Sequence, residues 1–124
     1  MPNTESMLQT IYDDNNIFAR IIRGEIPAKK FYEDEQVLAF YDIAPLTPIH
    51  LLVIPKGRYI SFDDFVTTAS SEQISYFFIK VQAIAEQLGL TSNGYRIIAN
   101  HGADANQQVS HFHVHILGGK KLDH

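Results

Sequence analysis

The chain has 124 residues, of which 45% are hydrophobic and 19% charged, and its formal net charge is −4 at pH 7. This length suits one globular domain, and the acidic balance excludes the broad basic surface that nucleic-acid binding requires. The sequence has no cysteine, which excludes disulfides, thiolate metal sites and a cysteine nucleophile. Its apolar runs are shorter than the roughly 20 residues that span a bilayer, and its polar N-terminus does not resemble a signal peptide. We therefore expect a cytoplasmic protein without a nucleic-acid or membrane partner.

Polar side chains dominate the first 14 positions and predict a flexible leader, residues 1–14, before a single domain at residues 15–124. The domain opens at residues 17–23, where apolar side chains share one helical face before Gly24. This pattern predicts a short helix. Three apolar runs follow and predict strands at residues 30–32, 37–41 and 49–54.

A long helix and two further strands are expected in the second half of the chain. Residues 70–88 repeat apolar side chains at helical spacing, and Ser70 with Gln73 forms a capping pair at the start. Alternating segments at 95–99 and 109–117 predict the last two strands. The hairpin-like order of strands, with one long helix inserted, predicts an α+β domain with an antiparallel sheet.

Half of the six histidines occupy alternate positions in the last predicted strand: His111, His113 and His115. Side chains of a strand alternate between its two faces. The three imidazoles would therefore line one face and project together into a shared cavity. The residues between and after them would pack into the core on the other face: Phe112, Val114 and Ile116.

A row of imidazoles is suited to covalent chemistry at phosphorus. The central imidazole can attack, while its neighbours bind phosphoryl oxygens and move protons. Metal catalysis is an alternative, but the outer two histidines of a strand triplet lie roughly 13 Å apart. Because zinc–nitrogen bonds are only about 2.1 Å long, a zinc site would need two of the three and a further ligand. The candidates for that ligand are His50, His101 and Asp104.

Other residues could complete a nucleotide site, although each of them alone also has an ordinary structural explanation. Asn100, Gln107 and Gln108 supply amide donors near the last strand, and Asp42 could accept hydrogen bonds from ribose hydroxyls. His50 could join the imidazole cluster. An apolar slot for a base could form from Ile17, Phe18, Ile21, Ile26, Phe40 and Ile43.

These residues resemble the histidine triad superfamily, whose mark is His-x-His-x-His followed by two apolar residues, as in residues 111–117. The resemblance extends to the Hint branch and runs from about residue 15 to residue 121. The further matching segments are 17–28, 39–45 leading to His50, 53–56, 94–96 with Asn100, and 117–119.

The resemblance implies a domain with a five-stranded antiparallel sheet, one long helix and one short helix, usually assembled as a homodimer. It implies hydrolysis of the P–N bond of nucleoside 5′-phosphoramidates, with a purine, AMP-like nucleotide, through a nucleotidyl-histidine and without metal or cofactor. By motif position, the catalytic residues would be His113 as nucleophile, flanked by His111 and His115 and supported by His50. The nucleotide-binding residues would be Ile17, Phe18, Ile21, Phe40, Asp42, Ile43, Asn100, Gln107, Gln108 and Val109.

Two positions depart from the pattern that the resemblance suggests. Many members have glycine where this chain has Asn106, and serine or glutamate where it has Gln108. Gln108 can donate hydrogen bonds but cannot act as a hydroxyl or a carboxylate. A nucleotide-binding sensor or interaction module with weak catalysis is the alternative to an enzyme, with a metal-dependent hydrolase as a third hypothesis.

Overall fold

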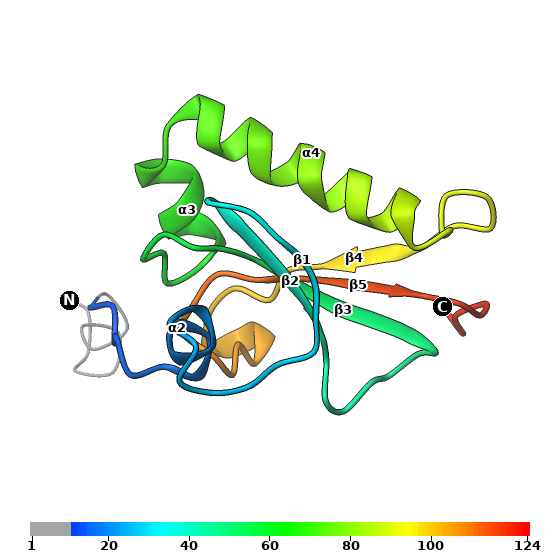
Figure 1. The fold of residues 1–124 in the computed structure, drawn as a ribbon, viewed down its shortest axis with the longest axis horizontal. Helices are drawn as coiled ribbons and strands as arrows, with labels where there is room; N and C mark the ends of the chain where they lie inside the picture. The colour runs from blue at the N-terminus through cyan, green and yellow to red at the C-terminus, as the bar shows by residue number, and fades with distance from the viewer. Residues whose placement is uncertain (1–10) are drawn as a thin grey trace.

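A five-stranded antiparallel sheet forms the centre of the computed structural model, which describes residues 11–124 (Figure 1). The strands lie in the order β1-β2-β3-β5-β4, and every neighbouring pair is antiparallel. Their bounds are β1 (Lys30–Glu33), β2 (Val37–Tyr41), β3 (Ile49–Pro55), β4 (Arg96–Ile98) and β5 (Val114–Gly118). The helices are α2 (Ile17–Ile22), α3 (Phe62–Thr68), α4 (Ser71–Gln87) and the 3₁₀ turn η1 (Ala103–Ala105). This confirms the predicted α+β class and the antiparallel sheet.

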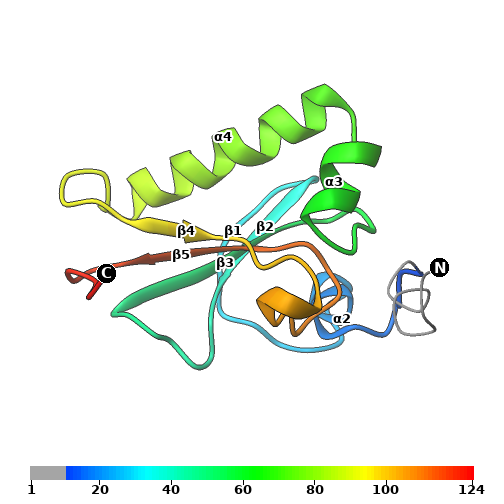
Figure 2. The same cartoon turned by 180° about the vertical axis from the view of Figure 1, so that it is seen from behind.

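The two faces of the sheet are covered by different helices, with α4 and α3 on one side and α2 on the other (Figures 1 and 2). Alternation along β2 supplies both cores. Val37 and Ala39 pack with α4, whereas Leu38 and Phe40 pack with α2. Both faces are therefore buried, which explains why β2 reads as a continuous apolar run rather than an alternating one.

The last strand is shorter than the sequence predicts, because it begins at Val114 and not at residue 109. Pairing with β3 ends at Val53 and Val114. Before that point the main chain bonds elsewhere: the amide of Phe112 donates to the carbonyl of Tyr59 over 2.8 Å. The alternation of faces still holds, because Phe112, Val114 and Ile116 all belong to the core under α4.

Capping residues define both helices on the α4 side of the sheet. Ser70 and Gln73 form the predicted capping box of α4, and the helix ends with Leu88 as its C-cap. The short helix α3 was not predicted from the sequence. Its signal was present, since Ser61 caps the helix by accepting the amide hydrogen of Asp64, in the Ser-x-x-Asp spacing typical of a helix start.

The N-terminal leader predicted for residues 1–14 lies mostly outside the described part of the chain. Of its residues, 11–14 are described, and Tyr12 and Asp14 contact the domain through side-chain hydrogen bonds. None of the helices in the described range, 11–124, combines the length and hydropathy that a bilayer-crossing helix requires.

Candidate active site

A cavity of about 530 Å³ opens on the α2 face of the sheet, beside the last two histidines of the triplet. This volume is within the range of small-molecule sites, about 300–1,000 Å³. Most of the residues predicted to bind a nucleotide line it: Ile17, Phe18, Ile21, Phe40, Asp42, Ile43, Asn100, Gln108 and Val109, with Ile26 beside them. His113 and His115 complete its polar wall.

One end of the cavity is apolar and adjoins the central histidine. Phe18 and Ile21 of α2 and Phe40 of β2 are buried there. The ring of Phe18 meets the ring of His113 edge to face, with centroids 5.0 Å apart. Ile43 stands at the rim and is 97% exposed. An aromatic group in this slot would therefore lie next to the imidazole of His113.

His113 has one defined ring tautomer. Its Nδ1 lies 2.7 Å from the main-chain carbonyl oxygen of His111. A carbonyl oxygen can only accept, so Nδ1 carries the hydrogen and Nε2 keeps its lone pair. The ring lines the cavity, and its bare nitrogen is the nucleophilic form of imidazole.

His111 is completely buried and does not line the cavity, which corrects the prediction that all three imidazoles share it. Its Nε2 lies 2.7 Å from the carbonyl oxygen of Pro55, so this nitrogen donates. Its Nδ1 lies 2.6 Å from the hydroxyl of Tyr12 and must accept. The physical reason is that the ring of His111, which precedes β5, packs against the rings of Tyr12 and Phe18, with centroids 5.6 and 6.3 Å away.

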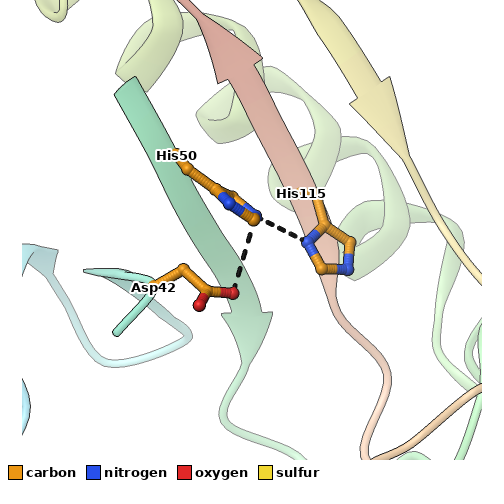
Figure 3. Close-up of side chains that lie close together, drawn as sticks. All are labelled: Asp42, His50 and His115. Carbon is orange, nitrogen blue, oxygen red and sulfur yellow. Dashed lines mark hydrogen bonds and ion pairs between the residues drawn. The ribbon is translucent and has the colours of Figure 1, made fainter. Parts of the chain in front are cut away.

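His115 on β5 forms a pair with His50 on the neighbouring strand β3 (Figure 3), and His50 does not line the cavity. The amide of Leu46 donates to Nδ1 of His50 over 3.1 Å, so the proton of His50 is on Nε2. That nitrogen donates to Nδ1 of His115 over 2.9 Å. The hydrogen of His115 must therefore be on Nε2. His113 and His115, with ring centroids 5.2 Å apart, carry opposite tautomers.

Burial keeps these imidazoles neutral at pH 7. It lowers the pKa of His111 to about 4. The pKa of His115 is also lowered to about 4, by burial and then by the neighbouring imidazoles of His113 and His50. Burial lowers the pKa of His113 and His50 as well, opposed at both by the negative charge of Asp42. A neutral His113 is ready to attack without first losing a proton.

A metal site was the alternative use for these histidines. Within residues 11–124, the set whose ligand atoms all lie within 4.8 Å of one another is Asp42, His50 and His115. His101 and Asp104, also considered as ligands, are not part of it. A metal-bound histidine offers a lone pair to the metal and donates its other N–H. His50 has the opposite arrangement, because its other nitrogen accepts from Leu46. The geometry thus favours a hydrogen-bonded histidine pair.

The predicted amide donors divide into two groups. Asn100 and Gln108 line the cavity, whereas Gln107 does not. The side chain of Gln107 donates to the carbonyls of Ile60 and Val109, and its oxygen accepts from the amide of Gly102. Gln107 therefore holds the loop in shape and has no free donor for a phosphate.

Several features of the site were not predicted from the sequence. Asn106 lines the cavity in a left-handed conformation, with φ 58°, which suits asparagine or glycine. Asp42 also caps its own loop, because its Oδ1 accepts from the amide of Ala44 over 2.8 Å. The groups that determine the histidine tautomers are main-chain atoms of Leu46, Pro55 and His111, which no residue type reveals.

The fold and the site together define an α+β domain with two histidines of the triplet in the wall of a partly apolar cavity. The HIT domain model matches residues 23–122, and the chain belongs to this family. An uncharacterized HIT-like protein of Rickettsia prowazekii is 50% identical over 112 residues, which cover 90% of this chain and 93% of that protein.

Solved structures agree with this family assignment. A histidine triad protein from Clostridium difficile is 40% identical, with a TM-score of 0.81 and coverage of 92% of this chain and 98% of that one. A HIT family hydrolase from Legionella pneumophila is also 40% identical, with a TM-score of 0.81 and coverage of 86% and 95%.

Proposed function

We propose that the protein is a hydrolase that cleaves the P–N bond of nucleoside 5′-phosphoramidates. The nucleotide part of the substrate would be an AMP-like purine nucleotide. The observation that carries the proposal is the tautomer of His113, whose bare Nε2 belongs to a ring on the cavity wall while Nδ1–H is held by the carbonyl of His111. A likeness to a protein described as a HIT family hydrolase supports the reaction class.

The lining of the cavity supports a substrate with a single phosphate. The polar side chains that line it are imidazoles, amides, the phenol of Tyr41 and one carboxylate, and neither lysine nor arginine is among the lining residues. A substrate with several phosphates would need cationic partners for its extra charge. One phosphoryl group can be held by hydrogen bonds from His115 Nε2–H, Asn100 and Gln108. The apolar slot beside Phe18 would take the base, and Asp42 would accept from the ribose.

The reaction proceeds in two steps. His113 Nε2 attacks phosphorus as the P–N bond breaks, and the leaving nitrogen takes a proton from water. The nucleotidyl-imidazole then carries a positive charge, which the carbonyl of His111 stabilises by accepting from Nδ1–H. Water next attacks phosphorus and gives a proton to the hydroxide that the first step left, the bond to Nε2 breaks, and the lone pair of His113 is restored. One water molecule is consumed overall, and the products are a nucleoside monophosphate and an amine.

The first test measures turnover of an adenosine 5′-phosphoramidate. The second stops the reaction without acid and uses mass spectrometry to locate a nucleotidyl group on the protein. We expect His113→Ala to abolish turnover and the adduct, while the protein still binds AMP. His101→Ala is the matched control, since His101 is exposed and does not line the cavity. Near-normal turnover by His113→Ala would contradict the proposal, and a native protein that binds AMP without turnover would favour a sensor.

We also propose that two copies associate through β4. This strand is at the edge of the sheet, paired with β5 on one side. Ile97 is 50% exposed, and its partner in the register, Ile116, belongs to the core under α4. A second exposed isoleucine, Ile79, lies on α4. An edge strand with exposed apolar side chains is suited to pairing with a second copy.

A further inference from the structure

Tyr12 approaches the buried histidine of the triplet from the segment that precedes α2. Its hydroxyl lies 2.6 Å from Nδ1 of His111, and the two rings meet edge to face with centroids 5.6 Å apart. Because the hydrogen of His111 is on Nε2, the hydroxyl must be the donor. Tyr12 is not among the residues that line the cavity.

This bond connects to the proposed nucleophile through a single residue, His111, whose ring bonds to Tyr12 and whose main-chain carbonyl bonds to His113. The hydroxyl of Tyr12 donates to His111 Nδ1, and His111 Nε2–H donates to the carbonyl of Pro55 over 2.7 Å. Both ring nitrogens of His111 are thus engaged, which fixes its tautomer and its ring orientation. The main-chain carbonyl of the same residue accepts from His113 Nδ1–H over 2.7 Å.

Contacts with the domain hold Tyr12 at this position. The carboxylate of Asp14 accepts two hydrogen bonds from Arg58, over 2.9 and 3.0 Å. Arg23 donates to the carbonyl of Asp14 over 2.7 Å. The guanidinium of Arg58 also lies 5.3 Å from the centroid of the Tyr12 ring. Arg58 and Arg23 therefore hold Asp14 against the domain, two positions after the tyrosine that contacts His111.

We propose that Tyr12 is a positioning residue, whose hydroxyl locks His111 and thereby holds the carbonyl that orients His113. The catalytic part of this inference rests on the proposed function. Without the hydroxyl, Nδ1 of His111 would be a buried acceptor without a donor, and the ring would shift or recruit water to satisfy it. Such a shift would move the carbonyl of His111 and loosen the orientation of His113 Nδ1–H.

The test is Tyr12→Phe, which keeps the aromatic ring and removes only the hydroxyl. The matched control is Tyr32→Phe, which also removes one hydroxyl hydrogen bond, the 2.7 Å bond to Asp34, at a part-buried position. We expect kcat of Tyr12→Phe to fall about 10-fold with KM changed less than about twofold, because a small misplacement of the nucleophile slows chemistry more than binding. Tyr32→Phe should retain native kcat.

Nitrogen and proton NMR of the histidine rings supplies a readout that does not require turnover. In Tyr12→Phe, the Nδ1 resonance of His111 should lose its hydrogen-bonded shift, and the Nδ1–H signal of His113 should move and exchange faster with water. Neither should change in Tyr32→Phe.

Three results would overturn the inference: native kcat in Tyr12→Phe, an equal loss of kcat in Tyr32→Phe, or unchanged His113 signals. If the native protein hydrolyses no phosphoramidate, the proposed function fails instead. The His113 signals then decide the positioning role by themselves.

Discussion

The histidines of this site differ in which ring nitrogen carries the proton. His113 and His115 have opposite tautomers, although they are two positions apart and both line the cavity. Main-chain groups produce the difference: a carbonyl faces Nδ1 of His113, whereas an amide reaches His115 through His50. One ring thus offers a lone pair and the other a hydrogen, as a nucleophile and a phosphoryl-binding donor require.

His50 should act only through His115. We expect His115→Ala to lower kcat about 100-fold, the lower end of the range for positioned proton-transfer groups, and His50→Asn to lower it less, about 10-fold. The double variant should be no slower than His115→Ala alone, because the tautomer that His50 sets has no function without the second ring. Steady-state kinetics of the three variants measures this. Additive losses would show that His50 has a separate role.

Activity should persist below the ordinary pKa of histidine. His113 must be unprotonated to attack, and burial lowers its pKa below 6.5. We therefore expect kcat/KM to stay level as pH falls through 6.5 and to decline only at lower pH. Phosphoramidates hydrolyse spontaneously in acid, so the rate with His113→Ala is subtracted at each pH. A decline centred at or above pH 6.5 would contradict the expected effect of burial.

The points at which β5 and α2 begin shape the site as much as the packing of these elements does. Because β5 begins only at Val114, the carbonyl of His111 lies outside the strand and accepts a hydrogen bond from His113 Nδ1–H. Helix α2 covers the opposite wall, where Asn16 caps it by accepting the amide hydrogen of Ala19. A full-length strand from residue 109 would have placed that carbonyl in the ladder instead.

The capping box of α4 should stabilise the domain without affecting chemistry. Ser70→Ala removes the side chain that accepts from the amide of Gln73. We expect the free energy of unfolding to fall by about 1 kcal/mol, the usual effect of losing such a cap. Urea denaturation measures the change, and Ser71→Ala is the matched control inside the same helix. A loss of kcat at full saturation in Ser70→Ala would contradict the separation of this helix from the site.

The whole molecule should lose stability in mild acid. His111 and His115 have pKa values of about 4 in the folded state because burial disfavours their charged forms. Between pH 6.5 and 4 the unfolded chain takes up protons at these positions and the folded chain does not. The free energy of unfolding should therefore decrease as pH falls through this window.

Urea titrations at several pH values measure this decrease. Replacing His115 with asparagine should make the decrease shallower, whereas replacing the exposed His101 with glutamine should not. If the free energy of unfolding decreased equally with falling pH in the native protein and in His115→Asn, the lowered pKa of His115 would be contradicted.

The proposed dimer can be tested at the edge of the sheet. Ile97→Lys places a charge on the exposed side of β4 and should convert the dimer to a monomer, as inward or edge lysines block strand pairing in other sheets. Sedimentation equilibrium measures the mass. Leu46→Lys is the matched control, because Leu46 is 72% exposed in a loop away from β4. A native monomer, or a dimer that survives Ile97→Lys, would contradict the proposal.

Local sequence pattern was sufficient to predict most of the fold and most of the residues that line the cavity. Helical spacing in residues 70–88, alternation in Phe112, Val114 and Ile116, and the run of histidines are visible in the printed chain, and the structure confirms the elements and faces that they predict. These features are predictable because each depends on the spacing of side chains along one segment.

Only the tertiary structure determines the surroundings and the hydrogen-bond partners of each histidine. The pairing of His50 with His115 joins positions 65 residues apart, and the contact of Tyr12 with His111 joins positions 99 apart. The place where β5 begins depends on Tyr59, whose main-chain carbonyl accepts a hydrogen bond from the amide of Phe112. Main-chain carbonyls and amides select each tautomer, and every residue type carries the same main-chain groups. Their direction exists only once the chain has folded, and this is why the sequence predicted that all three imidazoles would share one cavity.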